Sequence, residues 1–451
     1  MPLWILSLLL SVPAGANAAG AATASAPDEA AQAGPIAWST ASYVRAVLDA
    51  APEVRQTLEA MASSKAKERS DFAKSFFPAL SFSAVLNPAK LAPGDRFTFD
   101  DWKIPANDLT LSPGASWNLF NNYRDKLGVR SNRLGRKVAE QNLESSRQSQ
   151  ALTALSAYYG LLLQKKLLEV ARQNLKVQHE QYQLTLDRYE HGMKSLSDLL
   201  KTETDWRSSE LNMETVEAQR RLALFRFNVL IGLEEDTPVA LPESLSLGTT
   251  EAPRLNEGLR GALMHRPEIR RNLLELENAD ISYRLARINI GPTLSLDFDF
   301  SHPYDAPYGR TAADSGLKAA VYNVTMKLAL PGAFNVYSQA QDLMAARADW
   351  RSSRQTRESL RRQIREEAYR AHIELLRALR TNEIAMRKED ISRQNLEIVK
   401  EQYSQGSADV IRLSEAQSDH VNAQVERVQA FHDTNLNYAR YLVAIGEPIW
   451  R

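Results

Sequence analysis

Cysteine is absent from the 451-residue sequence. The chain therefore has no disulfide and no cysteine to lipidate, and iron–sulfur and thiol chemistry are excluded. An excess of charge of one sign is also absent, since Lys+Arg and Asp+Glu number 55 each. This balance argues against a nucleic-acid partner and against a polybasic membrane anchor. No apolar run reaches the ~18–20 residues that a membrane-spanning helix needs, so helices do not carry the chain across a bilayer, whereas strands still could.

Signatures of catalysis are scarce as well. The sequence holds 7 histidines, but it contains no HExxH, no histidine pair at helical ligand spacing, no phosphate-binding loop and no GxGxxG. His179 and His191 lie in segments predicted to be helix or turn, where a solvated side chain is the simpler interpretation. We therefore expect a protein that is not an enzyme and that holds no cofactor and no metal.

The amino-terminal segment resembles an export signal. Leu3 to Leu10 is a short apolar run, and Ala16-Asn17-Ala18 is a small-x-small cleavage pattern, which predicts a signal peptide over 1–18. No Lys or Arg precedes the run, so either the free amino terminus supplies the charge or the true start lies upstream. The Ala-rich stretch 19–40 is predicted to be a flexible mature N-terminus.

Two halves of the chain share one layout. RYEHGMKSLSDLLKTETD, which contains Gly192, matches QYSQGSADVIRLSEAQSD, which contains Gly406, and these glycines are 214 positions apart. The same interval relates Ile231-Gly232 to Ile445-Gly446 and the prolines of FFPALSF and NIGPTLSL. The pattern indicates an internal duplication, with repeat 1 over 41–232, a linker or equatorial segment over 233–256 and repeat 2 over 257–451.

Each repeat reads as helix, two strands, long helix, glycine turn and helix. The long helices are predicted over 131–189 and 335–403, or about 90 and 100 Å at 1.5 Å per residue. The shorter helices are predicted over 41–74, 195–232, 257–289 and 409–446, and each pair together is about as long as the long helix beside it. We expect a rod in which one long helix runs beside two shorter ones stacked end to end. Gly192 and Gly406 would reverse the chain at one tip, where a left-handed residue follows a helix C-terminus.

Heptad spacing after each turn favours coiled-coil packing. Two seven-residue registers are present, each interrupted once: Leu199, Trp206, Met213 and Phe227, and Ala416, Ala423, Ala430 and Ala444. An ordinary solvent-facing helical bundle with imperfect heptads explains these stripes almost as well.

The predicted strands alternate between apolar and polar residues. In TLSLDFDFS the apolar positions alternate with Asp297 and Asp299, and in VYNVTMKLAL the polar positions include Lys327. A soluble sandwich also alternates, but strands of about ten residues behind an export signal favour a transmembrane barrel. The two β-hairpins are placed at 79–123 and 292–330, with extracellular loops at 87–114 and 302–316. Asp297, Asp299 and Lys327 would face the water-filled lumen.

Four strands cannot close a barrel, and backbone embedded in lipid tolerates no open edge. The chain is therefore expected to pool its strands with copies of itself. Two chains would supply eight strands and three would supply twelve, and both are even numbers seen in such barrels. Eight strands are largely filled by their own side chains, whereas twelve could leave a lumen.

The paired tip motifs RYEHGMKSLSDLL and QYSQGSADVIRLS, the repeat endings NVLIGL and LVAIGE, and the RPEI segment resemble the TolC-type outer-membrane efflux proteins, over roughly 41–447. The resemblance implies an α+β membrane protein: a homotrimer whose twelve-stranded barrel, four strands per chain, continues into a long periplasmic α-helical coiled-coil barrel. It also implies a passive exit duct in the outer membrane of a Gram-negative-type cell envelope. The tips at Gly192 and Gly406 would dock a periplasmic adaptor (membrane fusion) protein and an energised inner-membrane transporter, for efflux or type I secretion.

The resemblance also places a periplasmic gate just beyond the tip turns. The best-known family member carries aspartates six and nine residues after its second tip glycine, where this chain has Arg412 and Glu415. The equivalent positions after Gly192 hold Asp198 and Lys201, so the signs are reversed between the repeats. We expect Asp198–Arg412 and Lys201–Glu415 to attract across the hairpins and favour a closed state. The alternative is that these residues form i,i+3 pairs within each helix on a solvated face, worth about 0.2–0.5 kcal/mol per pair.

A competing hypothesis is a periplasmic coiled-coil adaptor or scaffold protein without a transmembrane barrel. Such an adaptor would carry one helical hairpin per chain beside small β-domains, whereas this sequence has two hairpins, each with amphipathic strands. The motifs name no cargo, because the transporter mainly selects it.

Overall fold

The computed structural model describes residues 36–86, 109–235, 237–241, 247–248, 251, 253–289, 291–304, 321–330 and 333–450. The first half contains β1 (Ile36–Ala37), α1 (Thr40–Ala50), α2 (Pro52–Phe76), β2 (Ala79–Leu86), β3 (Leu109–Phe120), α3 (Arg124–Glu190), α4 (Leu196–Ile231) and β4 (Val239–Ala240). The second half contains α5 (Leu255–His265), α6 (Pro267–Ile288), β5 (Thr293–Tyr304), β6 (Val321–Ala329), α7 (Ala333–Ser404) and α8 (Val410–Ile445). Apart from β1 and β4, the second half repeats the element order of the first.

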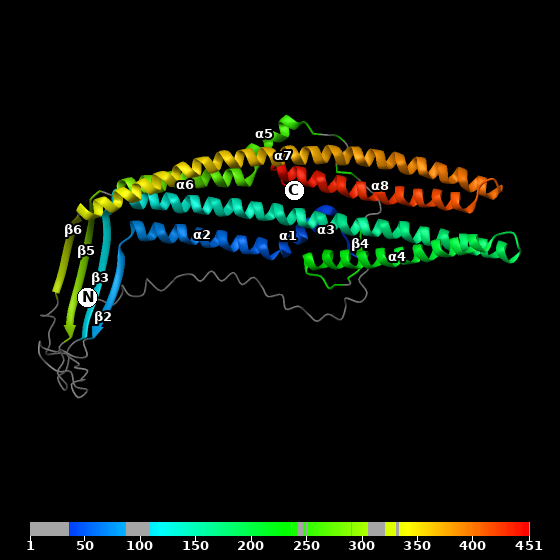
Figure 1. Ribbon diagram of the computed structural model, residues 1–451. Helices are drawn as coiled ribbons and strands as arrows, with labels where there is room; N and C mark the ends of the chain where they lie inside the picture. The colour runs from blue at the N-terminus through cyan, green and yellow to red at the C-terminus, as the bar shows by residue number, and fades with distance from the viewer. Residues whose placement is uncertain are drawn as a thin grey trace, which may run out of the picture.

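The molecule is elongated, with the sheet at one end and two helical hairpins at the other (Figure 1). The long helices α3 and α7 contain 67 and 72 residues, which corresponds to about 100 and 110 Å. Helix α3 packs against α2 near the sheet and against α4 towards the tip, and α7 packs against α6 and α8 in the same way. The predicted arrangement of long helices beside shorter, stacked ones is confirmed.

The predicted single helices over 41–74 and 257–289 are wrong, because a proline divides each of them. Ala51 and Arg266 have extended backbones, with ψ of 121° and 131°. A residue before proline is sterically disfavoured in the helical region, whereas Pro52 and Pro267 suit the first position of the next helix. The short helices are therefore α1 followed by α2, and α5 followed by α6. None of the described helices combines the length and apolarity that a bilayer-crossing helix requires.

Strand β3 differs from its prediction. The sequence placed a loop up to residue 114, whereas β3 runs from Leu109 to Phe120. Pro113 is tolerated because no β3–β5 pairing is formed at this residue: pairs with β5 are made at Leu111 and next at Gly114. The strand ends where Asn122 and Tyr123 take positive φ values of 54° and 63°, and α3 begins seven residues before the predicted start.

The predicted N-terminal tail at 19–40 also needs correction where it is described. Ile36–Ala37 pairs in parallel with Val239–Ala240, and Ser39 forms a capping box with Ser42 at the start of α1. The predicted signal peptide at 1–18, residues 19–35 and the loop segments 87–108 and 305–320 lie outside the described residues.

Four strands form one antiparallel sheet in the order β2-β3-β5-β6. Its register sorts the side chains by face: Leu296 pairs with Trp117 and Met326, whereas Asp297 pairs with Ser116 and Thr325. One face is therefore apolar and the other polar. Strands β2 and β6 each have a neighbour on one side in the described sheet.

The main hydrophobic core lies midway along the rod, where α1, α3, α4 and α8 meet. The rings of Tyr43 and Phe227 stack with centroids 3.8 Å apart, and the Tyr43 hydroxyl donates to the Phe227 carbonyl oxygen at 3.0 Å. Burial raises the pKa of Tyr43, so the hydroxyl stays protonated and remains a donor. This core holds α4 against α1 and α3 and thereby sets the orientation of the first hairpin.

Candidate functional site

Both tips are built from the same turn. Gly192 and Gly406 have φ of 72° and 75°, so the predicted left-handed turn residues are confirmed. The N–H of Gly192 donates to the carbonyl of Tyr189 at 2.9 Å, and that of Met193 donates to the carbonyl of Arg188 at 2.8 Å. The equivalent bonds recur at Gly406 and at the residue after it. This pattern satisfies the last carbonyls of a helix and ends it at the glycine.

The next helix begins four residues after each glycine, at Leu196 and at Val410. Ser195 caps α4 by accepting from the N–H of Asp198 at 3.1 Å, and Asp409 caps α8 by accepting from the N–H of Arg412 at 2.8 Å. Asp198 and Arg412 therefore occupy equivalent first-turn positions. The positive end of the helix dipole favours the carboxylate of Asp198 and disfavours the guanidinium of Arg412.

The two hairpins touch each other around Tyr403, which is 7% exposed. Its hydroxyl oxygen accepts a hydrogen bond from the side-chain amide of Gln181 at 3.3 Å. The Arg188 Cζ and the Lys194 Nζ lie 5.7 and 5.4 Å from the centroid of its ring. Ser414 reaches across from α8 and donates to Asp205 at 2.9 Å. Near the tips, the first hairpin is thus held to the second by one aromatic ring and a few polar contacts.

The gate candidates lie close to this contact. Lys201 pairs with Asp205 of its own helix at 2.5 Å, whereas the side chains of Asp198, Arg412 and Glu415 form no ion pair within the described part of this chain. Lys201 thus pairs within its own helix, but with Asp205 rather than with Asp198. The i,i+3 pairs Asp198–Lys201 and Arg412–Glu415 are not formed among the described residues. The cross-hairpin pairs Asp198–Arg412 and Lys201–Glu415 are not formed inside one chain, and they stay a prediction for contacts between chains.

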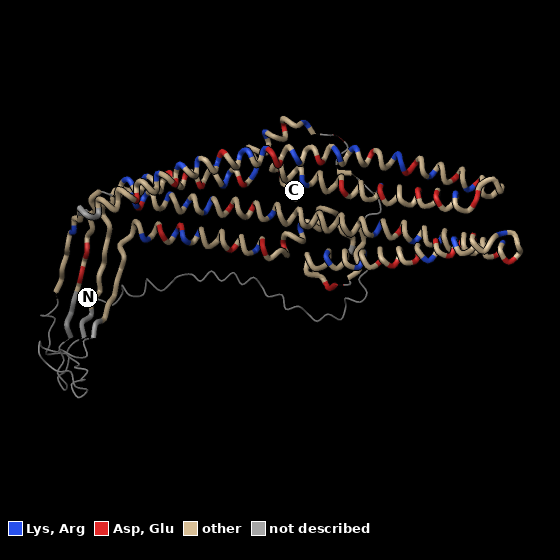
Figure 2. The backbone as a smooth tube through the Cα atoms, viewed as in Figure 1, with Lys and Arg blue, Asp and Glu red and all other residues tan. Residues whose placement is uncertain are grey.

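The polar face of the sheet carries the predicted lumen residues. Asp297 accepts from Lys327 at 3.0 Å, and Asp299 pairs in register with Asn323. Asp297, Asp299 and Lys327 are the charged residues of the four strands. Figure 2 shows that the helices carry many more charged residues than the sheet. The apolar face holds exposed side chains such as Phe82, Phe298 and Val324. The polar face is therefore suited to water and the apolar face to an apolar environment.

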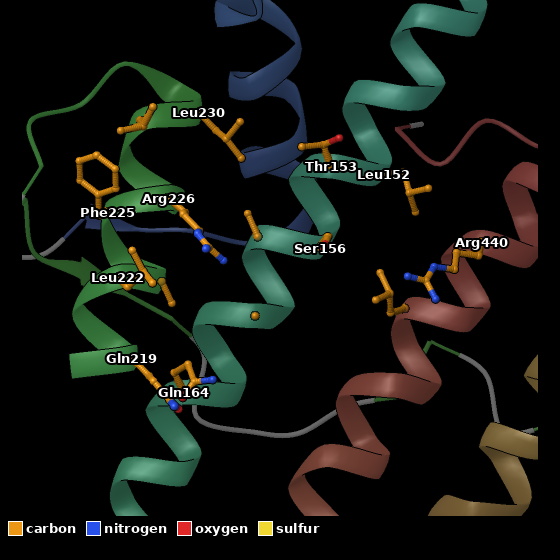
Figure 3. Close-up of a pocket in the computed structure, with 15 residues that line it drawn as sticks. Leu152, Thr153, Ser156, Gln164, Gln219, Leu222, Phe225, Arg226, Leu230 and Arg440 are labelled. Carbon is orange, nitrogen blue, oxygen red and sulfur yellow. The ribbon is translucent and has the colours of Figure 1, made fainter. Parts of the chain in front are cut away.

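An open groove of about 720 Å³ lies midway along the rod. Arg226 of α4 and Arg440 of α8 approach it from opposite sides of α3 (Figure 3). Its α4 wall is apolar and exposed, with Leu222 at 50% and Val229 at 52%. Sequence reasoning missed this groove, because its lining comes from α3, α4 and α8. The second tip motif contains Tyr403, but its contacts with the first hairpin were not predicted.

Paired helical hairpins joined to an amphipathic antiparallel sheet define an elongated α+β protein with one membrane-compatible end. The chain belongs to the outer membrane efflux protein family, whose profile matches residues 43–233 and 259–446. The resemblance to TolC-type proteins is thereby confirmed. The chain is accordingly an outer-membrane protein of the efflux type.

Solved structures share this fold. The outer-membrane channel OprN is 20% identical, with a TM-score of 0.74 over 90% of this chain and 89% of that one. The CmeC outer membrane channel of Campylobacter jejuni is 18% identical, with a TM-score of 0.72 over 91% and 86%. Nodulation protein T of Rhizobium leguminosarum bv. viciae is 22% identical over 296 residues, which cover 64% of this chain and 59% of that relative.

Proposed function

We propose that the chain forms the outer-membrane exit duct of a tripartite efflux or type I secretion system and conducts substrates passively. In this proposal three copies contribute four strands each to a twelve-stranded barrel, and the helices continue it through the periplasm. The observation that carries the proposal is the sheet with one apolar and one polar face. In a barrel, the apolar face contacts lipid and the polar face lines water.

Two features of the single chain support its assembly with further copies. The outer edges of β2 and β6 are unpaired within the described sheet, and a membrane-embedded sheet tolerates no open edge. Helix α4 also exposes apolar side chains at Leu211, Leu222 and Val229, as expected of a surface that another chain covers. Closure by further copies would satisfy both features.

The tips are the proposed docking site for a periplasmic adaptor, which would connect the duct to an inner-membrane transporter. Gly192 and Gly406 lie at the end of the rod farthest from the sheet (Figure 1), which is the end that a partner in the periplasm reaches first. The recurring element order and the matching turns support an internal duplication that gives each chain two such tips. An energised partner would supply the work, since the duct itself is proposed to be neither an enzyme nor a cofactor protein.

A matched pair of arginine substitutions tests the barrel. Phe298→Arg places a charge on the apolar face near the middle of β5, where an arginine facing lipid costs about 2–4 kcal/mol. Thr325→Arg places the same charge on the polar face, directly opposite Asp297. The measurement is the amount of protein that detergent extracts from outer membranes and that changes its electrophoretic migration on heating. We expect Phe298→Arg to reduce this amount strongly and Thr325→Arg to leave it near that of wild type.

Equal yields of the two variants would contradict the assignment of the faces. Extraction of the wild-type protein without detergent would contradict the barrel itself and favour a periplasmic coiled-coil adaptor or scaffold. Conductance of the purified protein in planar bilayers then tests the duct.

A further inference from the structure

A second groove, of about 740 Å³, lies where the helices join the sheet. It is formed by the last turns of α2 and α6 and the first turns of α3, beside the ends of β2, β3 and β5. Three aromatic side chains line it, Phe72, Phe76 and Tyr123. Five cationic side chains line it as well: Lys126, Arg130, Arg133, Arg284 and Arg287.

The groove carries an excess of positive charge. No carboxylate is among its lining residues. Lys126 and Arg287 are exposed, and neither forms an ion pair with another described residue. The other three cations are paired with acids just outside the lining, as Arg130–Glu277 (2.6 Å), Arg133–Glu68 (3.2 Å) and Arg284–Asp280 (2.8 Å). Two cations are therefore available to an anionic ligand.

The aromatic residues connect this groove with the apolar face of the sheet. The Tyr123 ring contacts Phe120 edge-on, with centroids 6.2 Å apart. Phe120 pairs in register with Leu294, on the apolar face. Phe72 and Phe76 lie 5.0 Å apart on α2, and both are largely exposed. Aromatic rings at the end of an apolar surface, followed by cations, are typical of the level of lipid headgroups.

From this arrangement we infer that the groove binds the phosphate headgroup of an anionic phospholipid in the inner leaflet of the outer membrane. Lys126 and Arg287 contact the phosphate, and Phe72 and Phe76 contact the upper part of an acyl chain. Basic pockets at the edge of a membrane domain recognise anionic headgroups in this way, and a guanidinium matches phosphate geometry. The inference rests on the proposed function in one respect: the apolar face must lie in the membrane.

Lipid binding to the full-length protein tests the site. Native mass spectrometry in detergent would measure the dissociation constants of phosphatidylglycerol and of phosphatidylethanolamine. We expect wild-type protein to prefer phosphatidylglycerol. Lys126→Gln/Arg287→Gln should weaken phosphatidylglycerol binding by about 30-fold, since each cation near an anionic lipid surface contributes about a five-fold change.

Arg172→Gln/Lys176→Gln is the matched control, because it removes two exposed cations of α3 about 70 Å farther along the helix. Its phosphatidylglycerol affinity should equal that of wild type. The inference is overturned if both double variants bind like wild type, if both lose affinity equally, or if the two lipids bind equally well. Displacement of the lipid by inorganic phosphate at matched concentration would also overturn it, since the site would then bind free phosphate.

The outcome is independent of conduction. A wild-type chain that prefers phosphatidylglycerol but conducts no ions in planar bilayers would contradict the proposed duct and support the lipid site. A chain that conducts but does not distinguish the two lipids would do the reverse.

Discussion

Helices α4 and α8 begin alike and end alike, yet they are buried very differently. Each contains 36 residues, starts at a side-chain cap and ends at a left-handed glycine. Helix α8 buries residues along its length from Val410 to Ile445, because it packs against both α7 and α3. The buried residues of α4 are Thr202, Ser209, Phe227 and Asn228, since α4 lies against α3 at the outer side of the bundle (Figure 1).

From this difference we infer that the exposed face of α4 packs against another copy of the chain. Its outer side chains include Leu211, Leu222 and Phe225, which are apolar and exposed in one chain. A solvated helix of a soluble bundle would carry polar residues there. We therefore interpret α8 as the core of one chain and α4 as its contact with the next copy.

Truncating one phenylalanine in each helix should give the largest difference between α8 and α4. Phe431 of α8 is 7% exposed and Phe225 of α4 is 40% exposed. Phe431→Ala leaves a cavity in the main core and should lower the free energy of unfolding by about 3–5 kcal/mol. Phe225→Ala should cost the folded chain much less and should reduce the fraction of trimer. Urea unfolding followed by circular dichroism, and native electrophoresis, measure the two effects. Equal losses in both assays would show that α4 and α8 do not differ.

The tip turns should respond identically in the two hairpins. Gly192→Ala and Gly406→Ala would each force a side chain into the left-handed region, which costs about 1–2 kcal/mol. A Cβ at either position meets no atom within 4 Å, so the cost comes from the backbone alone. Faster amide exchange at the altered tip is the expected result. Asparagine tolerates this backbone region better, and it is the control: if Gly406→Asn accelerates exchange as much as Gly406→Ala, backbone strain is not the cause.

The two hairpins also differ in the sign of the charges at equivalent tip positions. If Asp198–Arg412 and Lys201–Glu415 attract between chains, each pair contributes about 0.2–1 kcal/mol to the closed state. Arg412→Asp should then raise the open fraction in planar-bilayer conductance, and adding Asp198→Arg in the same chain should restore closure. A double variant as open as the single variant would reject the latch and leave pairing within each helix.

Lowering the pH should destabilise α8 and stabilise the tip of the first hairpin. Both changes in stability should be smaller than those caused by the substitutions above. Burial lowers the pKa of His420, which contacts Ser392 of α7 and has Glu389, Lys400, Arg393 and Glu397 nearby. The hydrogen bond from His191 to the Asp187 carbonyl raises the pKa of His191, and the nearby Asp187 and Glu190 carboxylates add to the rise.

The unfolded chain titrates near about 6.5 at both histidines. A lowered pKa in the fold means that α8 loses stability as the pH falls below this value. A raised pKa means that the first tip gains stability earlier, as the pH falls through the folded pKa towards this value, and that the gain is complete below it. Amide exchange from pH 8 to pH 5, about the window of the histidine titration, would reveal the opposite trends. His420→Gln should flatten the first trend and His191→Gln the second; unchanged profiles would contradict the assignment.

Sequence patterns predicted the features that depend on neighbouring residues. Gly192 and Gly406 were predicted as turns because a left-handed backbone requires glycine there, and the alternation around Asp297 predicted two faces because strand side chains alternate. The breaks before Pro52 and Pro267 were missed, although a residue before proline is disfavoured in the helical region. The start of β3 was missed because Pro113 and Gly114 resemble a loop until pairing with β2 and β5 is known.

Local residue order was enough to predict the periodicities, the glycine turns and the family. The tertiary structure decided which equivalent helix is buried and which is exposed, that Lys201 pairs with Asp205, and that Lys126 meets Arg287 at one groove. The physical reason is distance: these contacts join side chains from separate helices or choose one partner among several. Packing selects among partners that the sequence leaves equivalent.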